Sequence, residues 1–256
     1  RPDNDDYMSK GYVPLREQYD NSVSHALEYY IADFALSRFA EALGKKKDAE
    51  MFYKRSLGYK HYYSKEFGTF RPILPDGTFY SPFNPRQGEN FEPNPGFHEG
   101  SAWNYSFYVP HDVYGLAKLM GGKNPFIKKL QMVFDEGLYD PANEPDIAYA
   151  HLFSYFRGEE WRTQKETQRL LDKYFTTKPN GIPGNDDTGT MSAWAIFNMI
   201  GFYPDCPGLP EYTLTTPVFN KVTIRLDPKW YKEKELVIES NRTQPGTLYI
   251  NKVLLN

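Results

Sequence analysis

The chain has 256 residues, and 30 Lys and Arg against 33 Asp and Glu leave a formal net charge of −3. This near balance excludes a general nucleic-acid-binding protein, which needs a basic excess. No apolar run approaches the ~18 residues that a membrane span requires. The single cysteine, Cys206, excludes an intrachain disulfide and a cysteine-based metal cluster.

The N-terminal stretch is polar and lacks hydrophobic periodicity, so residues 1–20 are predicted to be a polar stub. From Ser22 apolar residues recur every three or four positions, and Gly44 follows as a typical C-terminal cap, which predicts a helix. A second helix is expected over residues 47–64. Two helices joined so tightly form an antiparallel helical hairpin.

Residues 67–100 contain too many Pro, Gly and Asn residues for a helix interior. Their many aromatic side chains argue against disorder, so a long, ordered and functional loop is predicted. The remaining pattern predicts helices over 101–120, 125–134, 146–156, 163–174 and 190–200. After Gly201, alternating β-branched residues predict short strands over 213–216, 221–226, 235–239 and 246–254.

This order of elements predicts a mainly α fold, made of helical hairpins and followed by a small β region. Hairpins with long loops on one side fit part of an (α/α)6 toroid, with the site where the loops converge. The expected organisation is a stub over 1–20, a toroid catalytic portion over 21–205 and a truncated β region over 206–256.

The stretch Gly184–Trp194 places two adjacent carboxylates, Asp186 and Asp187, between glycines at the start of a predicted helix. Asp and Asn are also ordinary helix N-cap residues, so this stretch taken alone is compatible with a capping role. The flanking glycines let the backbone approach a ligand closely, which favours a binding or catalytic role.

A second loop, Gly96–Tyr105, also runs into a predicted helix and carries His98, Glu99 and Trp103. Glu99 in a partly desolvated aromatic pocket fits a general acid, and its alternative is a capping residue in the first helical turn. His111 follows Pro110, which predicts a kink, and it is a candidate sugar contact or a structural histidine.

A third loop, Pro141–Asp146, contains Asn143 and Glu144. Their side-chain oxygens suit a hard cation such as Ca²⁺, although a proline-punctuated turn explains the same residues. Three carboxylate loops at the starts of helices suggest a glycosidase, because glycoside hydrolysis uses two opposed carboxylates.

Six strings in chain order resemble glycoside hydrolase family 92, a family of calcium-dependent, exo-acting α-mannosidases. They are Leu27–Tyr29, Glu99–Tyr105, Val109–Val113, Asn143–Pro145, Gly184–Trp194 and Gly201–Pro204. The resemblance covers most of the chain and implies removal of terminal mannose from mannosides or N-glycan-type mannans with inversion. It also implies a secreted, periplasmic or cell-surface protein.

The resemblance assigns roles residue by residue. It implies that Glu99 is the general acid and Asp187 the general base, with Asp186 beside it as its support or as the alternate catalytic base. Asn143 and Glu144 are implied contributors to a calcium site, and the implied sugar contacts are Trp103, His98 and His111. The chain has Asn185-Asp186-Asp187 where some members show Asp-x-Asp. It has Asp146-Ile147-Ala148 where many members carry a His pair after Asn-Glu-Pro.

Family members are much longer and place a β-sandwich before an (α/α)6 toroid. The chain is therefore expected to be the C-terminal part of the catalytic region, whose missing sandwich contributes to the site. Its expected partner is a mannose-containing oligosaccharide. Two other interpretations remain: a metal-independent toroid glycosidase of other specificity, and a fragment that binds carbohydrate without turnover.

Overall fold

The computed structural model describes residues 2–17, 20–88, 94–242, 244 and 246–255. The chain forms two compact units, which are described one at a time. Unit 1 comprises Arg1–Tyr149 with Cys206–Glu211, and unit 2 comprises Ala150–Asp205 with Tyr212–Asn256. Within the described ranges, helices dominate and strands are few and short, so the predicted mainly α class is confirmed. None of these helices is both long and apolar enough to cross a membrane.

Unit 1 is built from helical hairpins and irregular loops. Its α-helices are α1 (Pro2–Lys10), α2 (Ser22–Ala42), α3 (Lys46–Ser56), α4 (Ala102–Tyr105), α5 (Val113–Leu119) and α6 (Lys123–Asp135). Its 3₁₀-helices include η1 (Leu57–Tyr62), η3 (Pro110–Asp112) and η4 (Glu144–Asp146), and its strands β1 (Tyr63–Ser64) and β2 (Thr69–Phe70) pair antiparallel.

Unit 2 holds two longer helices and two short hairpins of strands. The 3₁₀-helix η5 (Tyr149–Tyr155) leads into α7 (Glu160–Tyr174), and η6 (Asp187–Gly189) leads into α8 (Thr190–Ile200). The strands are β3 (Phe202–Tyr203), β4 (Thr213–Leu214), β5 (Lys221–Arg225) and β6 (Glu235–Glu239). Strand β3 pairs antiparallel with β4, and β5 pairs antiparallel with β6.

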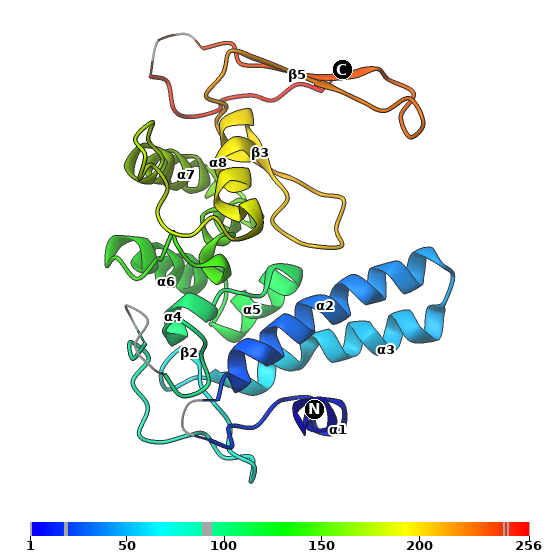
Figure 1. The fold of residues 1–256 in the computed structure, drawn as a ribbon, viewed down its shortest axis with the longest axis vertical. Coiled ribbons are helices and arrows are strands. Elements are labelled where there is room, and N and C mark those ends of the chain that lie inside the picture. Colours follow the sequence, from blue (N-terminus) through cyan, green and yellow to red (C-terminus); the bar gives the residue numbers. More distant parts are fainter. Residues whose placement is uncertain (1, 18–19, 89–93, 243, 245, 256) are drawn as a thin grey trace. The chain divides into compact units, whose positions relative to one another are not determined.

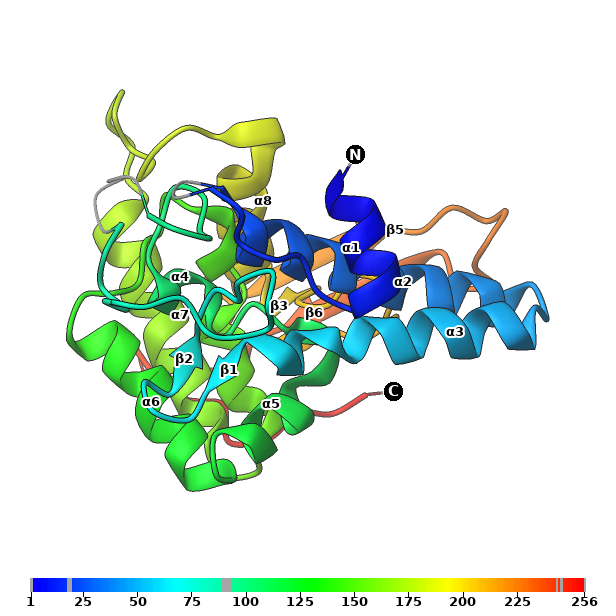
Figure 2. The same cartoon turned by 90° about the horizontal axis from the view of Figure 1, so that it is seen from below.

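The predicted helical hairpin is present, although its second helix, predicted over 47–64, is α-helical only over α3 and continues as the 3₁₀-helix η1. Helices α2 and α3 run antiparallel and side by side (Figures 1 and 2). Most of the periodic apolar residues of α2 form its buried face, and Leu27 and Tyr30 are fully buried, whereas Leu36 and Phe39 are exposed. Truncating such a leucine to alanine typically costs about 2–5 kcal/mol. Gly44, with φ +70°, supplies the left-handed turn between the two helices.

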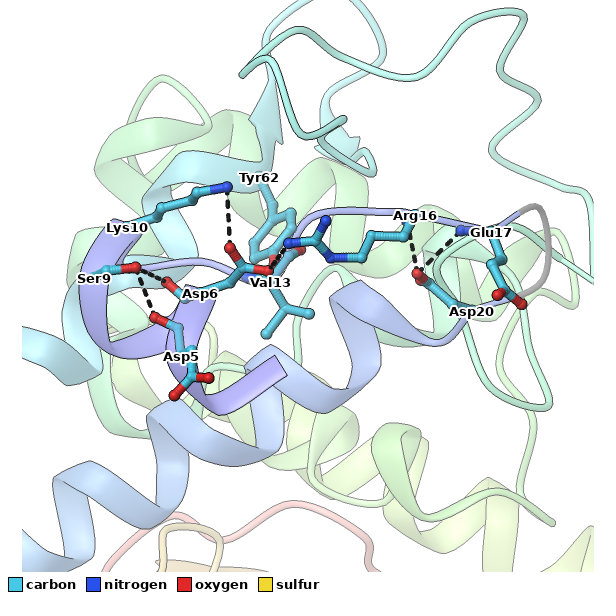
Figure 3. Close-up of polar contacts among 9 residues, drawn as sticks. All are labelled: Asp5, Asp6, Ser9, Lys10, Val13, Arg16, Glu17, Asp20 and Tyr62. Atoms are coloured by element: carbon cyan, nitrogen blue, oxygen red, sulfur yellow. Dashed lines mark hydrogen bonds and ion pairs between the residues drawn. The ribbon is translucent and has the colours of Figure 1, made fainter. Parts of the chain in front are cut away.

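The prediction of a polar stub over residues 1–20 was wrong in one respect, because part of this segment is helical and packs against α2. Residues 2–10 form α1, whose Tyr7 is buried and donates a hydrogen bond to Asp33 on α2 (2.6 Å). The carboxylate of Asp6 forms ion pairs with Lys10 (3.0 Å) and Arg16, and Val13 N–H donates to the Tyr62 hydroxyl (2.8 Å) (Figure 3). These tertiary contacts compensate for the lack of a periodic apolar pattern.

The helix predicted over 101–120 is instead divided into α4, η3 and α5. The break falls at Pro110, which has no N–H to donate and disfavours the helical conformation at the preceding residue. Val109 accordingly has φ −136° and ψ 59°. The helix predicted over 146–156 is 3₁₀ rather than α over most of its length.

In unit 2, α8 and β6 have the predicted bounds, and β4 and β5 are slightly shorter than predicted. The strand predicted over 246–254 is absent from the described residues there. The Ile250 N–H donates instead to Oε1 of Gln164 on α7 (3.0 Å), and the Leu248 carbonyl accepts from the Thr216 hydroxyl (2.6 Å). These backbone groups are therefore satisfied by side chains, not by a neighbouring strand.

Candidate active site

The loop that carries Glu99 lies against the first turn of α2 in unit 1. The Gly96 carbonyl accepts hydrogen bonds from Val23 N–H (2.9 Å) and Ser24 N–H (3.2 Å). Gly96 has φ +85°, and a Cβ at this position would lie 2.5 Å from Pro72. Only glycine fits both conditions, so the loop can approach α2 this closely. Residues 89–93 of the predicted functional loop lie outside the described residues.

Side chains hold the backbone of residues 98–101 at five of its polar groups. The contacts are His98 N–H to Ser24 Oγ (2.9 Å), Tyr105 Oη to the His98 carbonyl (2.6 Å), Asn143 Nδ2 to the Glu99 carbonyl (2.7 Å), Asn94 Nδ2 to the Gly100 carbonyl (3.0 Å) and Ser101 N–H to Asn104 Oδ1 (2.8 Å). We call these five side chains, Ser24, Asn94, Asn104, Tyr105 and Asn143, the acid-loop clamp. The loop conformation is therefore fixed by groups from several parts of unit 1.

Glu99 itself has a left-handed backbone, with φ 51°. This conformation costs a non-glycine residue about 1–3 kcal/mol and persists only where the surroundings over-determine it. Such strain concentrates at functional sites. The side chains of Glu99 and His98 are both 58% exposed, with His98 Nε2 at 3.6 Å from Glu99 Oε1.

The expected aromatic pocket around Glu99 is not formed within the described part of unit 1, where the Glu99 side chain is exposed. Trp103 is only 8% exposed, so little of its ring surface is open to a sugar. His98 is exposed, and its Nδ1 lies 3.2 Å from Asn21 Nδ2. Of the three predicted sugar contacts, His98 is thus the one that the structure places beside Glu99.

His111 lies in a structural setting. Its Nε2 is 2.9 Å from the Ser56 carbonyl at the end of α3, and its ring packs against Phe34 and Tyr59. Burial lowers the pKa of His111, which favours the neutral ring. These contacts explain His111 without a ligand, and its role in sugar binding stays a prediction.

The loop with Asn143 and Glu144 adjoins the Glu99 loop, as the hydrogen bond from Asn143 to the Glu99 carbonyl shows. Asn143 is 7% exposed, and Glu144 Oε1 is buried with no hydrogen-bond partner among the described residues. An orphaned buried carboxylate oxygen is the kind of ligand that Ca²⁺ takes. In the described ranges, this loop included, no three His, Cys, Asp or Glu side chains are grouped to hold a metal ion.

Glu28 was not predicted to be a site residue, although the Leu27–Tyr29 string that contains it is one of the six motifs. Glu28 Oε1 accepts a hydrogen bond from the Tyr108 hydroxyl (2.9 Å). Desolvation raises the pKa of Glu28, the Tyr108 hydrogen bond opposes this shift, and the negative charge of Glu144 adds to it. Glu28 and Glu144 therefore lie within electrostatic range of one another.

A buried polar group behind the two loops was also missed. Asp146 Oδ2 accepts from Asn104 Nδ2 (2.9 Å) and from Asp140 N–H (2.7 Å), and burial raises the pKa of Asp146 well above its usual range. Asn104 is also the third residue of α4 and forms a capping box with the N-cap residue Ser101. The Ser-x-x-Asn spacing was a local signal for this cap, whereas nothing local indicated Asp146 as its partner.

In unit 2, the adjacent carboxylates have different surroundings. Asp186 accepts from Ser192 Oγ (2.5 Å) and Ser192 N–H (2.9 Å), and these hydrogen bonds lower the pKa of Asp186. The Asp187 side chain is exposed and has no hydrogen-bond partner in the part of the chain that the structure describes. Thr188, directly after it, has φ 52°. Asp186 is thus occupied by helix α8, and Asp187 is available to a ligand.

Glu99 belongs to unit 1 and Asp187 to unit 2. Their convergence and the distance between their carboxylates stay predictions.

Comparison with known families identifies the class of protein. Residues 1–256 match the glycosyl hydrolase family 92 catalytic domain, so the chain belongs to this family. This confirms the resemblance that the six sequence motifs carried.

Solved structures give more particular similarities. The chain is 31% identical to the family GH92 α-mannosidase of Bacteroides thetaiotaomicron in complex with mannoimidazole, with a TM-score of 0.87 over 96% of this chain and 34% of that one. It is also 31% identical to a family GH92 inverting mannosidase of the same bacterium, with a TM-score of 0.87 over 100% of this chain and 36% of that one.

A curated relative from Arthroderma benhamiae, described as an uncharacterized secreted glycosidase, is 26% identical over 245 residues. The match covers 86% of this chain and 31% of that protein. The chain therefore spans about a third of the length of the relatives it matches.

Proposed function

We propose that the chain supplies the catalytic carboxylates of an exo-acting α-mannosidase that hydrolyses terminal mannose with inversion. The observation that carries this proposal is the similarity to two mannosidase structures, one of them described as inverting and the other bound to mannoimidazole. The chemistry of the loops agrees with it. In the described chain, positive φ among non-glycine residues occurs at Glu99 and at Thr188, which follows Asp187.

In this proposal Glu99 is the general acid and protonates the leaving glycosidic oxygen. The clamp fixes its backbone, so the point from which its exposed side chain leaves the loop is set before substrate binds. Asp187 is the general base that activates water, and its exposed carboxylate is free to do so. Asp186 supports it by capping α8 and setting the loop conformation.

Asn143 and Glu144 are the residues proposed to hold Ca²⁺. The fit rests on the orphaned Oε1 of Glu144 and on Asn143 Oδ1, because Asn143 Nδ2 is already bonded to the Glu99 carbonyl. Bound Ca²⁺ would supply a hard positive charge that holds the hydroxyls of the sugar. Since two side chains leave its shell of about 6–8 oxygens incomplete, we expect weak calcium binding by this chain alone.

The proposed substrate is a mannose-containing oligosaccharide of the N-glycan type, with His98, Trp103 and His111 as sugar contacts. The N-terminal β-sandwich of the same polypeptide is proposed to complete the site and to cover Glu99. A secreted, periplasmic or cell-surface location is proposed because the curated relative is described as secreted.

Product stereochemistry tests this function in the intact enzyme. An α-mannoside is hydrolysed and the first-formed sugar is followed by proton NMR before it mutarotates. Inversion predicts β-mannose, and it requires carboxylates roughly 6.5–9.5 Å apart, against about 5–5.5 Å for retention. Release of α-mannose would rule out the proposed mechanism, and no hydrolysis of any α-mannoside would rule out the proposed activity.

A further inference from the structure

We propose that Asn143 is a positioning residue for Glu99, and that the acid-loop clamp as a whole sets the direction of the Glu99 carboxyl. The inference deepens the proposed function, because it rests on Glu99 as the general acid. It assigns Asn143 a task in proton delivery that is separate from cation binding.

The geometry around Glu99 carries this inference. Asn143 Nδ2 donates to the carbonyl of Glu99 itself (2.7 Å), across 44 residues of chain. The Glu99 backbone is left-handed (φ 51°), so the residue would relax to an ordinary conformation if its neighbours allowed it. A change in φ rotates the side chain about the backbone and turns the carboxyl away from its present direction.

Neighbouring groups are restrained in the same way. On one side, the N–H and the carbonyl of His98 are bonded to Ser24 and Tyr105. On the other side, the Gly100 carbonyl is bonded to Asn94. The Glu99 side chain, by contrast, is 58% exposed, with its Oε1 at 3.6 Å from His98 Nε2. Restraint thus acts on the backbone from which the Glu99 side chain departs, while the side chain itself stays open to substrate.

Asn143 has two polar atoms with different tasks. Nδ2 donates to the acid loop, and Oδ1 has no hydrogen-bond partner among the described residues, so Oδ1 is the atom left for a cation. A change of Asn143 to Asp keeps an oxygen ligand of the same shape and removes the donor. The substitution therefore separates the positioning task from the cation task.

The test uses the intact enzyme with two substrates, an α-linked mannobiose and an aryl α-mannoside with a good leaving group. Only the disaccharide depends on protonation of its leaving oxygen. For Asn143→Asp we expect kcat on the disaccharide to fall by roughly 10- to 100-fold, because small displacements of a catalytic group have effects of this size. We expect KM and kcat for the aryl mannoside to change by less than about threefold, and calcium affinity by calorimetry to be retained.

Two further variants keep the outcome interpretable. Asn251→Asp adds the same charge at an exposed position and should match the wild type on both substrates. Ser24→Ala removes the acceptor for His98 N–H and hardly changes the volume of a buried site. Ser24→Ala should show the same selective loss of kcat on the disaccharide as Asn143→Asp. If Asn143→Asp does not fold, the result for Ser24→Ala tests the positioning role of the clamp.

Equal losses on both substrates in a folded variant, or no loss, would overturn the positioning role. Loss of calcium affinity with equal losses on both substrates would show that Asn143 acts only as a ligand. Glu99→Gln is the reference for the proposed function. If Glu99→Gln spares the aryl mannoside but the clamp variants lose nothing selectively, only the present inference fails. If Glu99→Gln shows no selectivity, the assignment of the general acid fails.

Discussion

The hydroxyl of Tyr149 joins α4 to the turn at residues 106–107 that follows it. It accepts from Phe107 N–H (3.0 Å) and donates to the Asn104 carbonyl (2.7 Å), and the residue is fully buried. Replacing Tyr149 with Phe keeps the ring and its edge-to-face packing against Phe107, at a centroid distance of 5.3 Å. The substitution therefore removes polar contacts and almost nothing else.

The expected loss is about 2–4 kcal/mol, the sum of one net hydrogen bond at about 1 kcal/mol and a buried, unsatisfied N–H at about 1–3 kcal/mol. Hydrogen exchange of the Phe107 amide measures this locally. Because about 1.4 kcal/mol corresponds to a factor of ten, its exchange should accelerate by roughly 30- to 1,000-fold.

Tyr53→Phe is the matched control, because Tyr53 is 49% exposed on α3 and loses little when its hydroxyl is removed. The free energy of unfolding should change by less than about 0.5 kcal/mol in this variant. If the Phe107 amide exchanged at the wild-type rate in Tyr149→Phe, the assignment of the hydroxyl as its partner in solution would be wrong.

Three further predictions follow from the site and from unit 1. Asp187→Asn should lower kcat on the disaccharide and on the aryl mannoside by the same factor, roughly 10²–10⁴. Asp186→Asn should mainly lower thermal stability, because it weakens the cap of α8. The opposite pattern would exchange the roles of the two residues. EDTA should abolish activity, and added Ca²⁺ should restore it. Glu144→Gln should raise the Ca²⁺ concentration needed for this restoration. Full activity in EDTA would favour a metal-independent glycosidase. Burial lowers the pKa of His111, so below pH of about 6.5 the unfolded chain binds a proton that the folded chain does not. Stability should therefore fall as pH drops through about 6.5, and His111→Gln should reduce that slope in urea unfolding; an unchanged slope would assign it to other groups.

Local patterns in the sequence determined much of the secondary structure. The periodic apolar face of α2 and the Gly44 cap predicted a helix that ends within two residues of its observed end. The bounds of α8 and β6 were predicted as well. These features depend on hydrophobic periodicity and on terminal residues, which are written in consecutive positions. The motifs around Glu99 and Asp187 likewise identified the family that comparison confirmed.

Only tertiary structure decided how the candidate site is held. The hydrogen bond between Asn143 and Glu99 crosses 44 residues, and the one between Tyr108 and Glu28 crosses 80. No periodicity reports which distant polar groups will meet, because that depends on which of them are buried together when the helices pack. The left-handed backbone of Glu99 has the same origin. A glutamate does not prefer this conformation, and it is held there by side chains that only the fold brings to it.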